Sequence, residues 1–299
     1  MIHAFTSARW TAPLGNHSFP MDKYRLVPSK LTDDGTLAVR EVSEPEAAAA
    51  ADVLLAHAAD YVSAFVRGTI GRAAMLRIGL PWSPQLVRRS FTVVGGTLAA
   101  ARAALQTGVA VNLAGGTHHA FADRGEGYCV FNDLVVAARR LRAEARARRF
   151  LIIDLDVHQG NGTAALCRQD PDVFTFSMHA EGNYPARKEP GSWDIGLPDG
   201  SGDERYLEAL AAALSRLPQR FSPDLILYQA GVDVLAGDRL GRLALTTRGV
   251  AERDRLVCDL ARRTGLPLAV TLGGGYAQDI GLVVEAHCQT VRIAKRLLG

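Results

Sequence analysis

The sequence predicts an α/β protein in which helices cover both faces of a central, mostly parallel sheet. Short apolar runs recur along the chain, and stretches of helical length separate them. Strands buried on both faces read as continuous apolar runs, and helical connections between strands favour parallel pairing. No internal repeat and no linker of biased composition interrupts the 299 residues. We therefore expect one three-layer α/β/α domain over residues 1–299.

Apolar runs predict the strands of this sheet. The runs are short, and several of them lead directly into polar or glycine-rich segments. In chain order, the expected strands cover residues 2–6, 109–113, 151–157, 173–178, 225–229 and 268–272.

The segments between these runs predict the helices. An alanine-rich helix is expected to begin at Ser43 or Glu44 with Pro45 in its first turn, and Gly108 marks the end of a second helix. The expected helices cover residues 44–65, 86–107, 133–149, 203–217, 247–264 and 280–298, while 10–40 and 179–202 are expected to be loops.

Composition excludes several classes of function. Hydrophobic residues make up 48% and charged residues 22%, and the net charge of +3 is too small to indicate a nucleic-acid-binding surface. Neither a signal peptide nor an apolar run long enough to span a membrane is visible. The four cysteines form no Cys-x-x-Cys pair, which argues against a disulfide framework and for the reducing cytoplasm.

The chemistry is expected to centre on the segment 151–162. Asp154, Asp156 and His158 are two residues apart at the end of an apolar run. On a strand such side chains project from the same face, and Asp with His suits a divalent metal such as zinc. The alternative is a solvated turn at a strand end. Ionisable groups in a buried strand are costly unless they are paired or bind a metal.

Four apolar runs end in polar or glycine-rich loops. These loops carry His118-His119, the segment 154–158, Asp233, and Gly273-Gly-Gly-Tyr276. Ligands of open α/β sheets bind beyond the carboxyl ends of the strands, so we expect the four loops to meet on one rim.

The residue types on this rim suit metal-assisted amide hydrolysis. Asp156, His158 and Asp233 are three candidate ligands that leave a position open, as in catalytic zinc sites. A nearby histidine pair can move protons, and Tyr276 can donate a hydrogen bond to a developing oxyanion.

With these residues assembled, the chain resembles the histone deacetylase family, whose fold is the arginase–deacetylase fold. The form His158-Gln-Gly-Asn161 resembles the class IV branch and its bacterial relatives, because class I and II enzymes carry His-His-Gly-Asp. The motifs that carry the resemblance are Gly115-Gly-Thr-His-His119, Gly127-Tyr-Cys-Val-Phe-Asn-Asp133, Asp154-Leu-Asp-Val-His-Gln-Gly-Asn-Gly162, Ala230-Gly-Val-Asp233 and Gly273-Gly-Gly-Tyr276.

The resemblance implies roles for the metal and proton-transfer residues. Asp156, His158 and Asp233 would bind zinc, with ferrous iron as the alternative metal. His118 and His119 would be the proton-transfer pair, with His119 as the general base.

Further roles follow from the same resemblance. Asp154 would orient His118, Asn161 would stand where most classes place a carboxylate beside His119, and Tyr276 would hold the substrate carbonyl. The backbone carbonyl of Gly127 would accept from the substrate amide, and Tyr128 and Tyr184 would wall a narrow tunnel. A structural potassium ion would lie near Asp154, Asp156, His158, Ser177 and Met178.

The function implied is a zinc-dependent hydrolase that removes acetyl or longer acyl groups from N-acyl-lysine side chains. A small acylated amine such as an acetylpolyamine is the alternative substrate. An arginase-like ureohydrolase is a competing class, but it needs more bridging carboxylates than Gln159 and Asn161 allow. A non-catalytic binding protein would be indicated by loss of a ligand, of the histidine pair or of the tyrosine, and all are present.

Asn161 yields a first testable prediction. An amide accepts a hydrogen bond from His119 but supplies no negative charge, so it favours the imidazolium less than a carboxylate does. We expect Asn161→Asp to raise the pKa of the acidic limb of the pH–rate profile. An unchanged acidic limb would count against this coupling.

Overall fold

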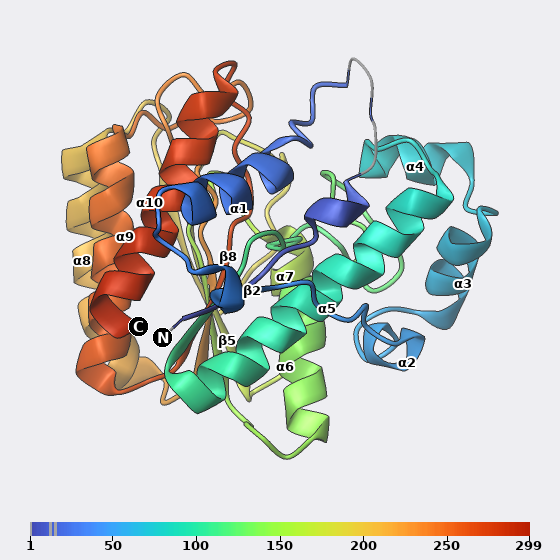
Figure 1. Ribbon diagram of the computed structural model, residues 1–299, viewed down its shortest axis with the longest axis horizontal. Helices are drawn as coiled ribbons and strands as arrows, with labels where there is room; N and C mark the ends of the chain where they lie inside the picture. The colour runs from blue at the N-terminus through green and yellow to red at the C-terminus, as the bar shows by residue number, and fades with distance from the viewer. Residues whose placement is uncertain (1, 12–13, 15–16) are drawn as a thin grey trace.

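The computed structural model describes residues 2–11, 14 and 17–299, and within them one eight-stranded sheet lies between two layers of helices (Figure 1). The strand order is β2-β1-β3-β8-β7-β4-β5-β6, and all paired strands run parallel. The strands are β1 (His3–Phe5), β2 (Val42–Ser43), β3 (Val109–Asn112), β4 (Phe150–Asp154), β5 (Val173–Ala180), β6 (Trp193–Leu197), β7 (Leu225–Gln229) and β8 (Leu268–Thr271). The predicted α/β class with a parallel sheet is confirmed.

Helices of two groups cover the two faces of the sheet, as Figure 1 shows. Leu151 and Ile153 of β4 face one core with α1, α8, α9 and α10, whereas Phe150 and Ile152 face the other core with α5 and α6. This alternation follows from strand geometry, so both faces of β4 must be apolar. The helices are α1 (Lys23–Asp33), α2 (Ala50–Val53), α3 (Ala59–Arg67), α4 (Arg72–Ile78), α5 (Pro84–Thr107), α6 (Asp133–Ala143), α7 (Asn161–Cys167), α8 (Asp203–Arg220), α9 (Thr247–Thr264) and α10 (Ile280–Leu298).

Local capping explains why the best-predicted helices begin where they do. The Ser83 hydroxyl accepts a hydrogen bond from the Leu86 N–H, and Pro84 fits the first turn because it has no N–H to satisfy. Thr246 and Asp279 cap α9 and α10 in the same way. The bounds 247–264 and 280–298 are therefore confirmed.

The central strand is shorter than predicted, because β4 ends at Asp154 rather than at residue 157. Beyond it, the Asp156 N–H donates to Asp154 Oδ1 and the His158 N–H donates to Asp156 Oδ1, at 3.2 and 3.0 Å. Beyond the end of β4, aspartate side chains thus accept the backbone N–H groups of Asp156 and His158 in place of carbonyls of a neighbouring strand. Strand alternation therefore does not determine the directions of Asp156 and His158, which lie beyond the end of β4.

The predicted helix over residues 44–65 was also wrong in its extent. The chain up to Ala49 is extended, since the Ala48 N–H donates to the Phe91 carbonyl of α5. The Ala58 N–H donates to the Ala122 carbonyl, which separates α2 from α3. The helix expected over 133–149 ends at Ala143.

Helices α1, α4 and α7 and strands β2 and β6 were not predicted. Pro28 lies inside α1, and a proline in a sequence normally argues for a loop. Strand β6 follows a glycine- and proline-rich segment and gains its structure by pairing with β5 at the sheet edge. No helix in the described residues is long and apolar enough to cross a membrane.

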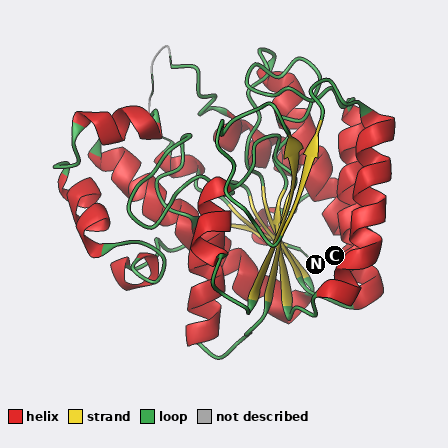
Figure 2. Ribbon diagram, turned by 180° about the vertical axis from the view of Figure 1, so that it is seen from behind, coloured by secondary structure: helices red, strands yellow, loops and turns green. Residues whose placement is uncertain are grey.

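Four neighbouring strands, β3, β8, β7 and β4, position the candidate site. Their carboxyl ends lie at the same edge of the twisted sheet, which Figure 2 shows from behind. The loops that carry His118-His119, 154–158, Asp233 and Tyr276 leave these four strands. The prediction that they share one rim is confirmed by the strand order.

His57 binds both ends of the second half of the loop between β3 and α6, behind this rim. Its Nδ1–H donates to the Phe121 carbonyl and its Nε2 accepts from the Asn132 N–H, both at 2.8 Å. Burial lowers the pKa of His57 to about 4, so the folded protein holds a neutral ring.

We predict that His57 makes folding stability depend on pH. The unfolded chain binds a proton near pH 6.5 but the folded chain only near pH 4, so this contribution is complete above pH 6.5 and is lost as the pH falls toward 4. Gln offers one hydrogen-bond donor and one acceptor and does not titrate. The free energy of unfolding, measured in urea at pH 7 and pH 5, should therefore differ by about 2 kcal/mol less in His57→Gln than in the wild type. An equal pH dependence in both proteins would contradict this role.

Candidate active site

The loop after β3 carries both candidate catalytic histidines. Gly115 and Gly116 adopt φ values of +81° and +76°, a backbone conformation that other residues rarely adopt. The carboxylate of Asp133 accepts the N–H groups of Gly116 and Thr117 at 2.9 and 2.8 Å. Asp133 therefore fixes the turn from which His118 and His119 project.

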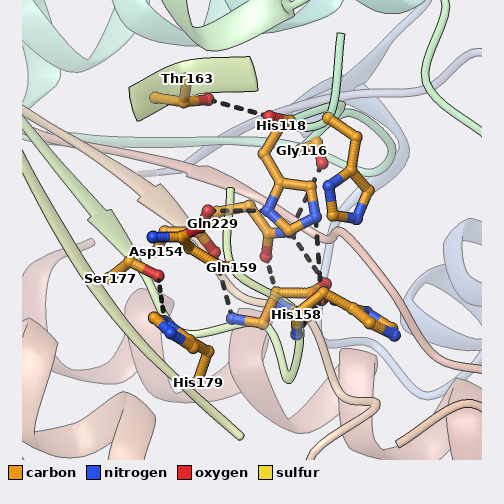
Figure 3. A network of polar contacts seen from close by, with 12 residues as sticks. Gly116, His118, Asp154, His158, Gln159, Thr163, Ser177, His179 and Gln229 are labelled. Atoms are coloured by element: carbon orange, nitrogen blue, oxygen red, sulfur yellow. Dashed lines mark hydrogen bonds and ion pairs between the residues drawn. The ribbon is translucent and has the colours of Figure 1, made fainter. Parts of the chain in front are cut away.

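His118 is paired with a carboxylate. Its Nδ1–H donates to Asp154 Oδ2 at 2.7 Å, and its Nε2 lies 3.8 Å from Asp156 Oδ1 (Figure 3). Burial disfavours the charged ring, but the charges of Asp154 and Asp156 outweigh it and raise the pKa of His118 to about 9. The two carboxylates therefore favour the imidazolium form of His118.

His119 is paired with an amide instead. Its Nδ1–H donates to Asn161 Oδ1 at 2.7 Å, and its ring centroid lies 4.0 Å from that of His118. Burial, followed by the nearby His118 and His158, lowers the pKa of His119 well below its usual value. The adjacent rings therefore prefer opposite protonation states.

Asp156, His158 and Asp233 form a candidate metal site. One ligand atom from each lies within 4.8 Å of the other two. His158 Nδ1 lies 2.9 Å from Asp156 Oδ1 and 3.2 Å from Asp233 Oδ2. All three residues are buried.

The electrostatics of this triad fit a cation. Burial and the neighbouring Asp156 raise the pKa of Asp233 to about 7, and Asp233 Oδ2 is buried without a hydrogen-bond partner. Burial opposes a charged His158, but the hydrogen bond to Asp156 and the nearby Asp233 carboxylate raise its pKa to about 10. A divalent metal ion would supply the positive charge that a proton on His158 otherwise provides. Two carboxylates with one imidazole are suitable ligands for zinc or ferrous iron.

The other side of Asp156 is held by groups that sequence reasoning missed. Its Oδ2 accepts hydrogen bonds from Gln229 Nε2 at 2.9 Å and from the Gly274 N–H at 3.0 Å. A Cβ at position 274 would overlap Asp233 Oδ2, which explains why glycine is needed there. The sequence feature that could have indicated this role is that the polar residue Gln229 ends an otherwise apolar strand.

Tyr276 is clamped by its backbone. Its N–H donates to Asp238 Oδ2 at 2.6 Å, and its carbonyl accepts from Arg239 Nε at 2.8 Å. Lys23 Nζ lies 5.3 Å from the centre of the phenol ring. Burial raises the pKa of Tyr276 well above its usual value, so the hydroxyl remains a hydrogen-bond donor.

A cavity of about 370 Å³ connects these groups with the surface. Gly127 and Tyr128 both have positive φ, and a Cβ at position 127 would lie 2.5 Å from His119 Cδ2. Tyr184 is 40% exposed, and its ring meets that of His119 edge to face at a centroid distance of 4.9 Å. The lining includes His118, His119, Gly127, Tyr128, Asp156, His158, Tyr184 and Tyr276.

The structure thus brings to one cavity the predicted proton-transfer and tunnel residues and two of the three predicted metal ligands, Asp156 and His158. Ser177 and Met178, assigned to potassium, lie on β5, where Ser177 is opposite Asp154 in the ladder. Asn161 begins α7 and faces His119 as expected. Glu126, Asp133 and Gln229 were absent from the expected site.

A buried candidate metal site with two carboxylates beside paired histidines, at the carboxyl edge of a parallel sheet, is an arrangement typical of metal-dependent hydrolases. The comparison with family models is more specific, because the model described as "Histone deacetylase domain" matches residues 17–291. The chain therefore belongs to the histone deacetylase family and is a hydrolase of amide bonds.

Individual relatives agree with this membership. The chain is 47% identical to an uncharacterized protein of Picosynechococcus sp. over 93% of each chain. It is 32% identical to Histone deacetylase 2 of Arabidopsis thaliana, over 90% of this chain and 72% of the relative. The crystal structure of an HDAC homolog from Aquifex aeolicus superposes with a TM-score of 0.84 and 24% identity, covering 99% of this chain and 88% of that one. The arginase–deacetylase-like fold predicted from the motifs is confirmed.

We predict that Asp233→Asn removes metal binding without unfolding the protein. The variant loses one of two anionic ligands, while its side-chain oxygen can still accept the Val157 N–H that now donates to Asp233 Oδ1 at 2.9 Å. Zinc should raise the melting temperature of the metal-free wild type but not of the variant. Zinc affinity, measured by competition with a chelating dye, should fall by more than about 100-fold.

Asp199→Asn is the matched control, because Asp199 is an exposed carboxylate paired with Arg242 far from the triad in sequence and outside the cavity lining. It should retain the zinc response. Equal zinc affinity in Asp233→Asn and the wild type would refute the assignment of this ligand.

Proposed function

We propose that this protein is a zinc-dependent amidohydrolase that removes acetyl or longer acyl groups from N-acyl-lysine side chains. The observation that carries the proposal is one cavity lined by the candidate metal ligands Asp156 and His158, by the histidine pair, and by the Tyr276 phenol. The resemblance of the motif at 158–161 supports placement in the class IV branch and its bacterial relatives. We further propose that residues 1–299 act as one catalytic domain.

The cavity suits an acylated amine on an aliphatic stem. Tyr128 and Tyr184 offer apolar ring faces to such a stem, and the backbone carbonyl of Gly127, which also lines the cavity, would accept from the substrate amide. The Tyr276 hydroxyl, kept protonated by burial, would donate to the substrate carbonyl as negative charge develops on it. Zinc, when bound, would acidify water and polarise the amide carbonyl.

The two histidines would divide the proton transfers. His119 is neutral, so its Nε2 can take a proton from the attacking water. His118 holds a proton beside Asp154 and can stabilise the developing charge and return a proton to the leaving amine. Asp156, His158 and Asp233 would hold the zinc, with ferrous iron as the alternative.

Other assignments follow the same logic. The Val157 carbonyl accepts the Ala180 N–H at 3.0 Å, so the segment 154–158 lies against the end of β5 and its oxygens are suited to a structural potassium ion. We propose that the enzyme is cytoplasmic, since its four cysteines are free and buried and form no disulfide. Gln159 donates to the Glu189 carbonyl and to Asp194 rather than joining the triad, which disfavours a two-metal ureohydrolase.

Amine release from a substrate panel tests the proposal. The panel contains acetyl-, octanoyl- and myristoyl-lysine peptides and acetylspermidine, each with and without zinc and a hydroxamate. We expect zinc-dependent, hydroxamate-blocked release from at least one lysine peptide. Release from acetylspermidine alone would redirect the assignment to small amines. No release from any substrate by the zinc-loaded, folded protein would indicate a non-catalytic binding protein.

We predict that Tyr276→Phe lowers kcat by about 100-fold or more, because it removes one donor to the developing oxyanion. The buried ring and its backbone clamp to Asp238 and Arg239 remain. Zinc content, measured by mass spectrometry, should be unchanged because the phenol is not a ligand. A variant with full kcat on the preferred substrate would exclude this role.

A further inference from the structure

A continuous chain of hydrogen bonds runs from His119 to the mouth of the cavity. His119 Nδ1–H donates to Asn161 Oδ1 at 2.7 Å, and Asn161 Nδ2 donates to Glu126 Oε1 at 2.7 Å. The same Glu126 oxygen accepts the Tyr184 hydroxyl at 3.0 Å. Both His119 and Asn161 are 3% exposed, and the Glu126 side chain is 15% exposed.

Glu126 determines which way the Asn161 amide faces. An amide has one accepting oxygen and one donating nitrogen, whereas a carboxylate accepts only. The nitrogen must therefore face Glu126, and the oxygen must face His119. The reverse orientation would oppose the amide oxygen to the Glu126 carboxylate, which has no proton to donate to it.

The amide orientation in turn determines the tautomer of His119. The Asn161 oxygen can only accept, so the proton of a neutral His119 ring must be on Nδ1. The lone pair is then on Nε2, the nitrogen that does not contact Asn161. A histidine whose Nδ1–H is fixed by a partner in this way is preorganised as a base.

We propose that Glu126 is a positioning residue that acts through Asn161 to hold His119 in the tautomer with a free Nε2. The inference rests on the proposed function for the role of His119 as base. It also explains why position 161 can be neutral. The carboxylate of Glu126 lies next after Asn161 in the hydrogen-bond chain that begins at His119.

The surrounding loop holds Glu126 in place. The neighbouring Gly127 N–H donates to the Arg77 carbonyl at 3.1 Å, and the Cys129 N–H donates to the Glu126 carbonyl at 2.9 Å. Arg124 Nε lies 3.5 Å from Glu126 Oε2, the oxygen not used by Asn161. The backbone hydrogen bonds of the loop therefore hold Glu126 in position, and its Oε1 oxygen accepts the hydrogen bond from Asn161.

The same geometry makes position 161 and position 126 interdependent. In Asn161→Asp, the new carboxylate would lie against Glu126 where an N–H now donates, and like charges at this distance repel. In Asn161→Asp combined with Glu126→Ala, the aspartate can accept from His119 in either orientation and needs no partner. Removing Glu126 should thus harm the asparagine enzyme and help the aspartate enzyme.

Steady-state kinetics of four variants test whether removal of Glu126 lowers kcat when residue 161 is Asn and raises it in Asn161→Asp. We expect Glu126→Ala and Asn161→Asp each to lower kcat by about tenfold or more, with KM changing by less than about threefold. The double variant should recover to within about threefold of the wild type. Glu126→Gln keeps an accepting oxygen for Asn161 and should stay within about threefold of the wild type. Asp123→Ala is the matched control, because it removes a neighbouring exposed carboxylate paired with Arg124.

The tautomer itself provides a readout that is independent of activity. Nitrogen-15 NMR of the zinc-loaded enzyme with labelled histidine, assigned with His119→Gln, reports which ring nitrogen of His119 carries the proton. The wild type, Glu126→Gln and the double variant should show protonated Nδ1. Glu126→Ala should show a mixture of tautomers.

The outcomes separate this inference from the proposed function. A wild type that hydrolyses no substrate but shows the Nδ1–H tautomer, lost in Glu126→Ala, would refute the function and retain the positioning role. Glu126→Ala with wild-type kcat and an unchanged tautomer would overturn the inference. So would a double variant whose loss of kcat equals the product of the two single losses, because the positions would then act independently.

Discussion

The constraint on which the structure depends is the proximity of two buried carboxylates, Asp156 and Asp233, around His158 Nδ1. Burial and the negative charge of Asp156 destabilise the ionised form of Asp233, and a cation between the two carboxylates would relieve this cost. The groups around the triad accordingly leave the centre open. Gln229 and the Gly274 N–H bind the far oxygen of Asp156, and the Val157 N–H binds one oxygen of Asp233. The remaining Asp233 oxygen has no partner among the described residues.

The parallel sheet makes this assembly possible. Residues separated by more than a hundred positions meet because β3, β8, β7 and β4 are consecutive neighbours and all end at the same edge. The strands are buried on both faces, so the interior of the sheet is apolar and polar groups gather where the strands end. The same arrangement explains why the chain shares its fold with a structure that is only 24% identical in sequence.

The two histidines differ because their partners differ. A carboxylate beside His118 stabilises the charged ring, whereas an amide beside His119 accepts a hydrogen bond without adding charge. Rings with centroids 4.0 Å apart cannot both be cationic without strong repulsion, so asymmetric partners separate their protonation states. The hydrogen-bond chain to Glu126 retains a carboxylate near His119 but separates the two by the Asn161 amide. At that position Glu126 orients the amide and has less effect on the charge of the His119 ring.

The sequence by itself determined the fold class, the family and most of the groups that line the cavity. Apolar runs report strands buried on both faces, and chemically distinctive residues at their ends stand out against an apolar background. Local patterns also located α9 and α10, because their caps and stop signals lie within a few residues. Tertiary structure alone decided where β4 ends, whether α1 and β6 form, and which groups support the site. Glu126, Gln229 and Asp238 are ordinary polar residues in the sequence, and their roles arise from hydrogen bonds to partners 35 to 73 positions away. Such partners become neighbours only after the chain has folded.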